Sequence, residues 1–470
     1  MYYNGQARCS GPRRRLSMRR IMTRDKSFYR RLVSLTIPVA LQNLITFAVN
    51  FADNLMVSSL GDAAVSGVYM AGQLQTFLQL FSGGVEGAIL ILSAQYWGKN
   101  DRDAIKRICS IGLHFSLVFG LLVTLVSLTL TEPVLSLFTS DPTVIACGKE
   151  YLRIVCLSFV LFCATQALIA AMRSVEAARI GMVVSSISLV FNISLNYVMI
   201  FGHLGCPALG LRGAALATLI SRAVELVSIG FYVGRVDQKL KLCFRDFLRS
   251  DKALRHDFIR YGMPLVINNV VWSVNTMGNS AILGRYGAEV ITAASVANTL
   301  NSLAYVTMNG MSSAVGIITG KTIGAGKTEL MREYARTVQV IFACLGLVTC
   351  GMMFLLRLPF IGLYAGISEG AVAYARQFTV VLSIAMAGTC YQAASLYGLV
   401  KCGGDITFVF KLDCFFVFLV VLPSALLAQH LGAAPWIVFA CLKCDQILKC
   451  FVAVVKINSF NWMKNLTRER

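Results

Sequence analysis

Long apolar runs recur along the whole chain, and they limit what it can fold into more than any other feature. Twelve of them reach the length of about 20 residues that an α-helix needs to cross a bilayer. They lie near residues 33–57, 70–95, 109–130, 152–172, 180–201, 211–234, 259–283, 295–318, 336–357, 376–399, 407–428 and 434–455. Apolar residues make up 56% of the 470 and charged residues only 14%, against about 45–50% and about 25% in soluble domains. The sequence therefore predicts an all-α integral membrane protein with twelve transmembrane helices.

The net charge of +20 is distributed unevenly about these predicted spans. Thirty-four Lys and Arg residues fall in the termini and the loops of one side, whereas the loops of the opposite side hold six. By the positive-inside rule, this bias predicts that both termini lie in the cytoplasm and that the protein is multi-pass in the plasma membrane. The basic residues then act as a topology signal and contact anionic membrane lipids. Nucleic acid is not an expected partner, because aromatic residues are not interleaved with the basic ones.

The chain also matches itself when it is displaced by 226 residues. Prolines, an asparagine and glycines coincide in this register, including Pro38 with Pro264, Asn43 with Asn269 and Gly98 with Gly324. Each copy holds six predicted spans, so both copies enter the membrane from the same side and an axis along the membrane normal relates them. This 6+6 repeat predicts a tail (1–31), an N-lobe (32–234), a linker (235–258), a C-lobe (259–456) and a C-terminal tail (457–470). Two lobes about such an axis are typical of alternating-access transporters.

Two Gly-Lys-Thr triplets in TGKTIGAGKT, residues 319–328, raise the question of a nucleotide site. A Walker A loop requires a glycine five positions before its Gly-Lys pair, but Val315 and Lys321 stand at these positions. In the repeat this stretch aligns with SAQYWGKNDR, so we interpret both as cytoplasmic turns. An NTP-driven pump would need a partner subunit, and we expect no enzyme activity. Cys441 and Cys444 lack a second ligand pair, so no metal site is predicted there.

Several segments carry a family resemblance. The first span reads IPVALQNLITFAVNFADNLMVSSLG, and the loops SAQYWGKND and TGKTIGAGK, the fifth-span ending NISLNYVMIFG and the segment LGLRGAALATLISR follow. Together, in this order and duplicated at 226, they resemble the multidrug and toxic compound extrusion (MATE) family from about Arg31 to Thr467. The resemblance implies a V-shaped 6+6 helical fold that exports organic cations or other amphiphiles against an inward flow of H+ or Na+. We expect a monomer with no cofactor besides this coupling ion.

Asp53 is the leading candidate for ion coupling, because ionisable residues inside spans are costly and are functional candidates by default. Its repeat mate is Asn279, so the acid occurs in one lobe only. Burial disfavours the charged carboxylate, so Asp53 can take a proton from one side and release it to the other; a helix-capping or hydrogen-bonded Asp is the alternative. The resemblance implies further cation-site positions in the fifth and sixth spans, here Asn192, Asn196 and Thr218.

The chain departs from part of the family at Asn196, where several members carry Asp. An amide can ligate Na+ through its oxygen but cannot hold a proton. This departure favours ion coupling mainly through Asp53 alone. A Na+ site formed by Asp53, Asn192 and Asn196 is the alternative. The family's other pattern, acids in the seventh and tenth spans, is absent from residues 272–280 and 390–397. Coupling through the second lobe is therefore not favoured.

Other charged residues inside spans have both structural and functional interpretations. Glu86 is either a proton carrier or an interhelical hydrogen-bond site, because flanking glycines would let another helix come close. Two pairs at helical spacing are predicted to neutralise each other: Arg222 with Glu225, and Asp445 with Lys449. Glu225 could instead belong to a proton relay.

The sequence indicates the cargo only through the side chains that could line a substrate cavity between or within the two lobes. Two matched pairs of amide side chains follow Pro38 and Pro264: Gln42, Asn43, Asn268 and Asn269. We expect these amides to line a substrate cavity, or else to join neighbouring helices by hydrogen bonds. Plentiful Met, Phe and Tyr residues favour amphiphilic or cationic small molecules. The nearest alternative is a flippase for a lipid-linked saccharide or other lipid. Such a protein would line its cavity with several Arg or Lys residues, whereas Arg222 is the only one predicted deep in the first ten spans.

Overall fold

The computed structural model describes residues 22–136, 141–203, 205–243, 245–246, 251–362 and 368–468. These residues form helices joined by short loops, and no strand occurs among them. Most of the predicted N-terminal tail, part of the predicted linker and the end of the C-terminal tail lie outside the described residues. The all-helical fold is the one that the apolar runs predict.

The helices fall into a first half, up to residue 243, and a second half, from residue 251. The first half contains α1 (Lys26–Ser58), α2 (Asp62–Gly98), α3 (Arg102–Thr129), α4 (Thr131–Ser136), α5 (Pro142–Val155), α6 (Ser158–Ser174), α7 (Arg179–Phe201), α8 (Gly210–Phe231) and the π-helical η1 (Tyr232–Val236). The second half contains α9 (Lys252–Gly284), α10 (Ala288–Gly324), α11 (Thr328–Gly362), α12 (Glu369–Gln392), η3 (Ala393–Lys401), α13 (Ile406–Phe415), η4 (Phe416–Val421), α14 (Leu422–His430), α15 (Pro435–Lys443) and α16 (Asp445–Ser459).

The internal repeat of the sequence is also a repeat of the backbone. Helices α9 and α10 begin and end 226 residues after α1 and α2. The N-caps repeat too, since Asp25 and Asp251 each accept a hydrogen bond of 2.9 Å from the backbone N–H two residues on. Gly61 and Gly287 precede α2 and α10 with the same φ of 99°, in a region that favours glycine. One structural unit has therefore been used twice.

Hydropathy identifies most of the long helices as membrane spans. Within the described ranges, eight helices are long and apolar enough to cross a bilayer, or nine if α5 and α6, bent by 51°, form one span. Three predicted spans are not among these nine: those at 259–283 and 295–318, on α9 and α10, and that at 434–455, which is divided between the short helices α15 and α16. For α9 and α10 the reason is their amide content, because α9 holds four Asn residues and α10 holds three. Such helices are expected to face a polar interior rather than lipid.

The two halves meet where α2 and α10 end, at the face of the bundle where α1 and α9 begin. We call this the terminal face. A Cβ atom at Gly98 would overlap the carbonyl oxygen of Lys321, and one at Gly324 would overlap that of Gln95. Only glycine allows backbones to approach so closely. The repeat mates Gly98 and Gly324 therefore let the two halves cross at this point.

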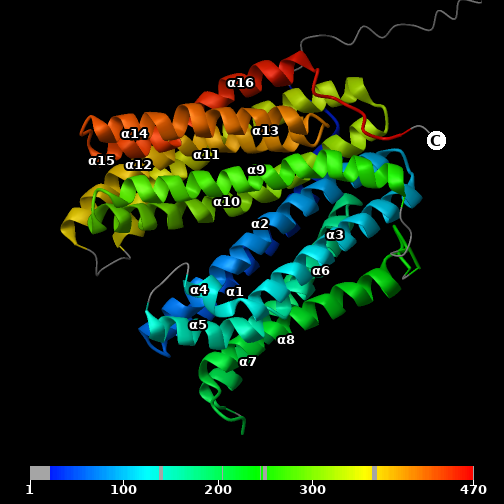
Figure 1. Cartoon of the computed structure of the whole chain (residues 1–470). Coiled ribbons are helices and arrows are strands. Elements are labelled where there is room, and N and C mark those ends of the chain that lie inside the picture. The colour runs from blue at the N-terminus through cyan, green and yellow to red at the C-terminus, as the bar shows by residue number, and fades with distance from the viewer. Residues whose placement is uncertain are drawn as a thin grey trace, which may run out of the picture.

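Polar contacts between the halves close the terminal face. The Nζ atom of Lys321 lies 2.8 Å from a carboxylate oxygen of Glu176, which stands between α6 and α7. The C-terminal segment crosses the same boundary, because Gln95 of α2 accepts a hydrogen bond from the Leu466 backbone. Within the second half, Arg468 of this segment pairs with Asp257 of α9 at 2.6 Å. Figure 1 shows the halves close together at this end and splayed apart toward the opposite end.

Candidate functional site

The first half gathers polar side chains around Asp53 of α1. Asn192 and Asn196 are four residues apart on α7, so they share one face of that helix, and both are almost fully buried. The Nδ2 atom of Asn196 donates to a carboxylate oxygen of Asp53 at 2.6 Å and to the amide oxygen of Asn192 at 3.2 Å. The structure thus brings together three residues that the sequence analysis proposed for a cation site.

Helix α8 completes the surroundings of this cluster. Arg222 forms an ion pair of 2.8 Å with Glu225, as the i,i+3 spacing predicts, and it also interacts electrostatically with Asp53. Its guanidinium lies over the ring of Phe162, 4.9 Å from the centroid. Thr218 is buried one turn before Arg222 and donates to the backbone of its own helix at 3.0 Å. The ion pair is therefore part of the Asp53 environment rather than separate from it.

The chemistry of this cluster suits a small hard cation or a proton. Carboxylate and amide oxygens are the ligand types that hard cations take, and the Oδ1 atom of Asn196 is buried without a hydrogen-bond partner. Rotation of this amide would turn its oxygen toward Asp53 in place of its nitrogen. Among the described residues, no three His, Cys, Asp or Glu side chains form a group that could hold a metal ion. Asp53 is the member of the cluster that can carry a proton.

Glu86 of α2 lies in a second polar region of the first half. Its one hydrogen bond with a described residue is a long contact of 3.4 Å from Ser82, one turn earlier on the same helix. Its electrostatic partner is Arg173 at the end of α6, which donates to the side-chain oxygen of Gln42 at 2.7 Å. The expectation that Arg222 is the only deep cation of the first ten spans was therefore wrong. Arg173 lies at a predicted span edge, but its side chain turns inward.

The glycines around Glu86 do admit another helix, as the sequence analysis anticipated. A Cβ atom at Gly84 would lie 2.5 Å from the Val266 side chain of α9, and one at Gly87 would lie 3.3 Å from Leu265. Asn269 of α9 donates across this contact to the carbonyl oxygen of Leu80 at 2.7 Å. The contact joins the two halves, but its hydrogen bond comes from Asn269 rather than from Glu86.

The amides proposed for the substrate cavity lie in several environments. Gln42 is buried and holds Arg173, while Asn43 is half-buried on α1. Asn268 is buried, with its side-chain oxygen unpartnered. Asn269 joins helices, which is the alternative that the sequence analysis raised. Their role toward a substrate stays a prediction.

A cavity of about 810 Å³ lies between the halves, mostly against the second half. Phe47 of α1 and Tyr69 of α2 line it from the first half. Polar residues of α9, α10, α12 and α16 make up much of the remaining wall, including Asn275, Asn279, Asn298, Asn301, Thr389 and Gln446. Lys443 and Asp445 are the charged residues of its described lining. The amides that lower the hydropathy of α9 and α10 thus face this space.

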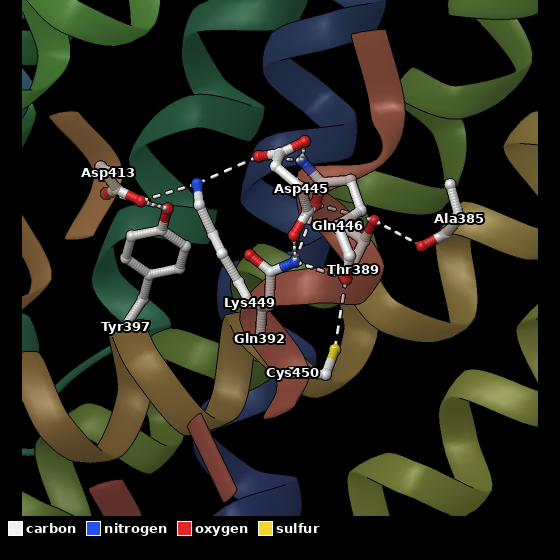
Figure 2. Close-up of polar contacts among 9 residues, drawn as sticks. All are labelled: Ala385, Thr389, Gln392, Tyr397, Asp413, Asp445, Gln446, Lys449 and Cys450. Carbon is white, nitrogen blue, oxygen red and sulfur yellow. Dashed lines mark hydrogen bonds and ion pairs between the residues drawn. The ribbon is translucent and has the colours of Figure 1, made fainter. Parts of the chain in front are cut away.

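The second half contains a buried cluster that the sequence analysis identified only in part. Lys449 contacts Asp445 at 3.0 Å, as the i,i+4 spacing predicts, and also Asp413 of α13 at 2.9 Å (Figure 2). Tyr397 donates to Asp413 at 3.2 Å, and the Gln446 amide lies 3.2 Å from each oxygen of Asp445. Asp413 was missed, although a lone Asp within an apolar run was a signal that could have identified it.

Comparisons with known proteins agree with this fold. The family model MatE matches residues 38–198 and 264–427, one segment in each half. The probable multidrug resistance protein NorM of Agrobacterium fabrum is 27% identical over 71% of this chain and 71% of its own length. The NorM of Halalkalibacterium halodurans is 25% identical over 85% of this chain and 87% of its own.

Solved structures share the same architecture. A mutant of the Vibrio cholerae MATE transporter VcmN superposes with a TM-score of 0.85 at 16% identity, over 94% of this chain and 98% of that one. A MOP superfamily transporter from Pyrococcus furiosus gives a TM-score of 0.81 at 19% identity, over 93% and 99%. With a matching segment in each half, the chain belongs to the MATE family of membrane transporters, not to an enzyme family.

Proposed function

We propose that this protein is a secondary active multidrug exporter that moves organic cations or other amphiphiles out of the cell in exchange for H+ or Na+. The observation that carries the proposal is the charge balance inside the first half. Three carboxylates lie there among the described residues, Asp53, Glu86 and Glu225, against two guanidinium groups, Arg173 and Arg222. A buried excess carboxylate is costly unless a proton or a cation neutralises it.

Asp53 is the carboxylate that we assign to ion exchange. Arg222 has its direct ion pair with Glu225, and Arg173 interacts with Glu86, so Asp53 is left with amide partners. Two mechanisms fit this position. Either Asp53 exchanges a proton largely alone, or Na+ binds between Asp53, Asn192 and Asn196. In both mechanisms the ion is coupled to the conformation of the protein. The ion shifts the populations of the inward-facing and outward-facing states only if it binds one of these states more tightly than the other.

The repeat supports the architecture that such a mechanism needs. We propose twelve spans in two lobes of six, with the boundaries that the sequence analysis gives and both termini in the cytoplasm of the plasma membrane. The terminal face would then be the cytoplasmic face, and its closed contacts would define an outward-facing state. Alternating access would open this face while the opposite end closes. We propose that the monomer performs this cycle.

The relatives' names support the export of drug-like molecules, because several are described as probable multidrug resistance proteins. The flippase alternative requires several cations in the cavity for phosphate. Arg173 and Arg222 are engaged by Gln42 and Glu225, and Lys443 is the one cation in the described cavity lining. We therefore favour the multidrug exporter.

The experiment that tests this function is dye transport in proteoliposomes under separately imposed H+ and Na+ gradients. We expect a cationic dye to move when one of these gradients is imposed, without ATP. Wild-type protein that ignores both gradients, or that moves dye only when ATP is supplied with a partner subunit, would contradict the proposal.

A further inference from the structure

We propose that Lys443 binds an anionic group, a carboxylate or a phosphate, on an amphiphile that occupies the cavity between the halves. This inference rests on the proposed role of that cavity in cargo transport. It adds a substrate chemistry that an organic-cation exporter does not require, namely recognition of a negative charge in the second half.

The position of Lys443 places its ammonium group at the cavity. Lys443 is the last residue of α15, two residues before α16 begins at Asp445, and it belongs to the cavity lining. Its Nζ atom lies 5.8 Å from the ring centroid of Phe439 on the same helix. Counting 1.5 Å per residue from Pro435, Lys443 lies roughly 12 Å from the start of α15.

The neighbouring carboxylate is already engaged. Asp445 is the acidic residue of the described lining and acts on Lys443 electrostatically. However, Asp445 is held by Lys449 at 3.0 Å and by the Gln446 amide at 3.2 Å. Lys449 also holds the other carboxylate, Asp413. Among the described residues, Lys443 therefore forms no ion pair, and the ammonium keeps donors to offer.

The remaining walls of the cavity suit a ligand of drug size. Its volume of about 810 Å³ lies within the range of small-molecule pockets, about 300–1,000 Å³. Phe47, Tyr69 and Trp272 provide aromatic surface, and amides such as Asn275 and Asn279 provide hydrogen-bonding groups. A flat apolar body with one negative group would bury its surface against the rings and place its charge at the ammonium.

A matched pair of ligands tests the site on the full-length protein in nanodiscs. One ligand is a rhodamine dye with a free carboxylate, and the other is the methyl ester of the same dye. We expect Lys443→Gln to weaken binding of the carboxylate dye about tenfold, the size of one charge-assisted hydrogen bond, and to leave ester binding unchanged. Lys443→Arg should retain the carboxylate dye. Lys401→Gln is the control, because Lys401 is a second-half lysine outside the cavity lining.

Lipid composition identifies the source of the anionic group. Binding is measured in discs of phosphatidylcholine alone and in discs that also contain phosphatidylglycerol. Competition by phosphatidylglycerol in the wild type but not in Lys443→Gln would assign the site to a lipid phosphate, and an absence of competition would assign it to the cargo. Equal weakening of both dyes by Lys443→Gln, or no weakening, would overturn the site. Gradient-driven export of the ester dye would persist in that case, so the proposed transport function would stand.

Discussion

The two halves of the molecule begin with the same pair of helices but contain different buried charges. In the first half, Asp53 accepts a hydrogen bond from Asn196 and forms no direct ion pair with a described residue, since Arg222 pairs with Glu225. In the second half, Asp413 and Asp445 share Lys449, and a further ammonium, Lys443, faces the cavity. The repeat therefore preserves the lengths, caps and crossing glycines of the first two helices of each half, but not the buried charges. The halves therefore differ in their balance of buried charge, which we expect to decide where ion exchange takes place. Buried carboxylates outnumber buried cations in the first half, whereas lysine side chains accompany the acids of the second half.

The repeat mates of the Asp53 cluster show how complete this difference is. Asn279 replaces Asp53, Phe418 replaces Asn192 and Leu422 replaces Asn196. The second half thus has neither the acid nor the amides at these positions. Two of its buried acids, Asp413 on α13 and Asp445 on α16, are held by Lys449. We interpret the first half as the coupling unit and the second half as a wall whose charges stay fixed during transport.

The largest expected effect is that of Asp53→Asn. Asn retains the shape and hydrogen bonding of Asp but cannot exchange a proton or fully neutralise Na+. We expect gradient-driven dye export to fall to background while dye binding to purified protein changes little. Transport in proteoliposomes and equilibrium dye binding measure the two effects, after membrane abundance has been matched. Export at the wild-type rate would show that coupling lies elsewhere.

The repeat supplies a matched variant for this experiment. Asp53→Asn combined with Asn279→Asp moves the acid to the equivalent position of the second half. We expect no recovery of transport, because Phe418 and Leu422 cannot provide the amide partners that Asn192 and Asn196 provide. Recovery in the double variant would mean that the two halves are interchangeable in ion coupling.

The next largest effect concerns stability. Lys449→Met leaves Asp413 and Asp445 buried without their shared cation, and breaking a buried ion pair in this way costs about 3–5 kcal/mol. We expect a clear loss of thermal stability in detergent. Adding Asp413→Asn and Asp445→Asn removes the unpaired charges and should restore most of the loss. If Lys449→Met is as stable as the wild type but does not respond to an ion gradient, the cluster exchanges ions and is not fixed.

The sequence predicts the fold well, because its determinants are local or repeated. Apolar runs specify helices, and a constant offset of 226 residues relates α1 and α2 to α9 and α10. The Asp53 cluster was also accessible, since the i,i+4 spacing places Asn192 and Asn196 on one face and the family resemblance points to Asp53. Asp413 could have been identified as an acid within an apolar run, but its pairing with Lys449 could not, because that partner lies on another helix. Arg173 was not accessible either, because its partner also comes from another helix. Gln42 is 131 residues from Arg173, and no pattern within one helix indicates such a contact.

A smaller effect is expected for Glu86→Gln. Among the described residues, Glu86 accepts one long hydrogen bond, from Ser82 on its own helix, so an amide can replace most of its contacts. We expect a decrease in transport rate of at most a few-fold. Arg173→Gln should cost more, because it removes the donor that holds Gln42 and leaves Glu86 without its counter-charge. Transport rates and thermal stabilities of the two variants measure this order. A dead Glu86→Gln beside an active Asp53→Asn would assign coupling to Glu86.

The smallest effect is expected at the terminal face, where a partly exposed ion pair joins the halves. Lys321 and Glu176 lie 2.8 Å apart, with side chains 27% and 20% exposed, and such pairs contribute about 0–1 kcal/mol.

A second ion pair provides the control. Arg332 and Glu329 lie 2.9 Å apart within α11, so they do not join the halves. Removing either pair should change thermal stability by less than about 1 kcal/mol. Only Lys321→Gln should also shift the protein toward states in which the terminal face is open, because its pair breaks when the halves separate there. Distances between spin labels on α2 and α10 near this face measure the shift, which should shrink at high salt. An equal shift in Arg332→Gln would mean that the ion pair across the boundary has no special part in holding the halves together.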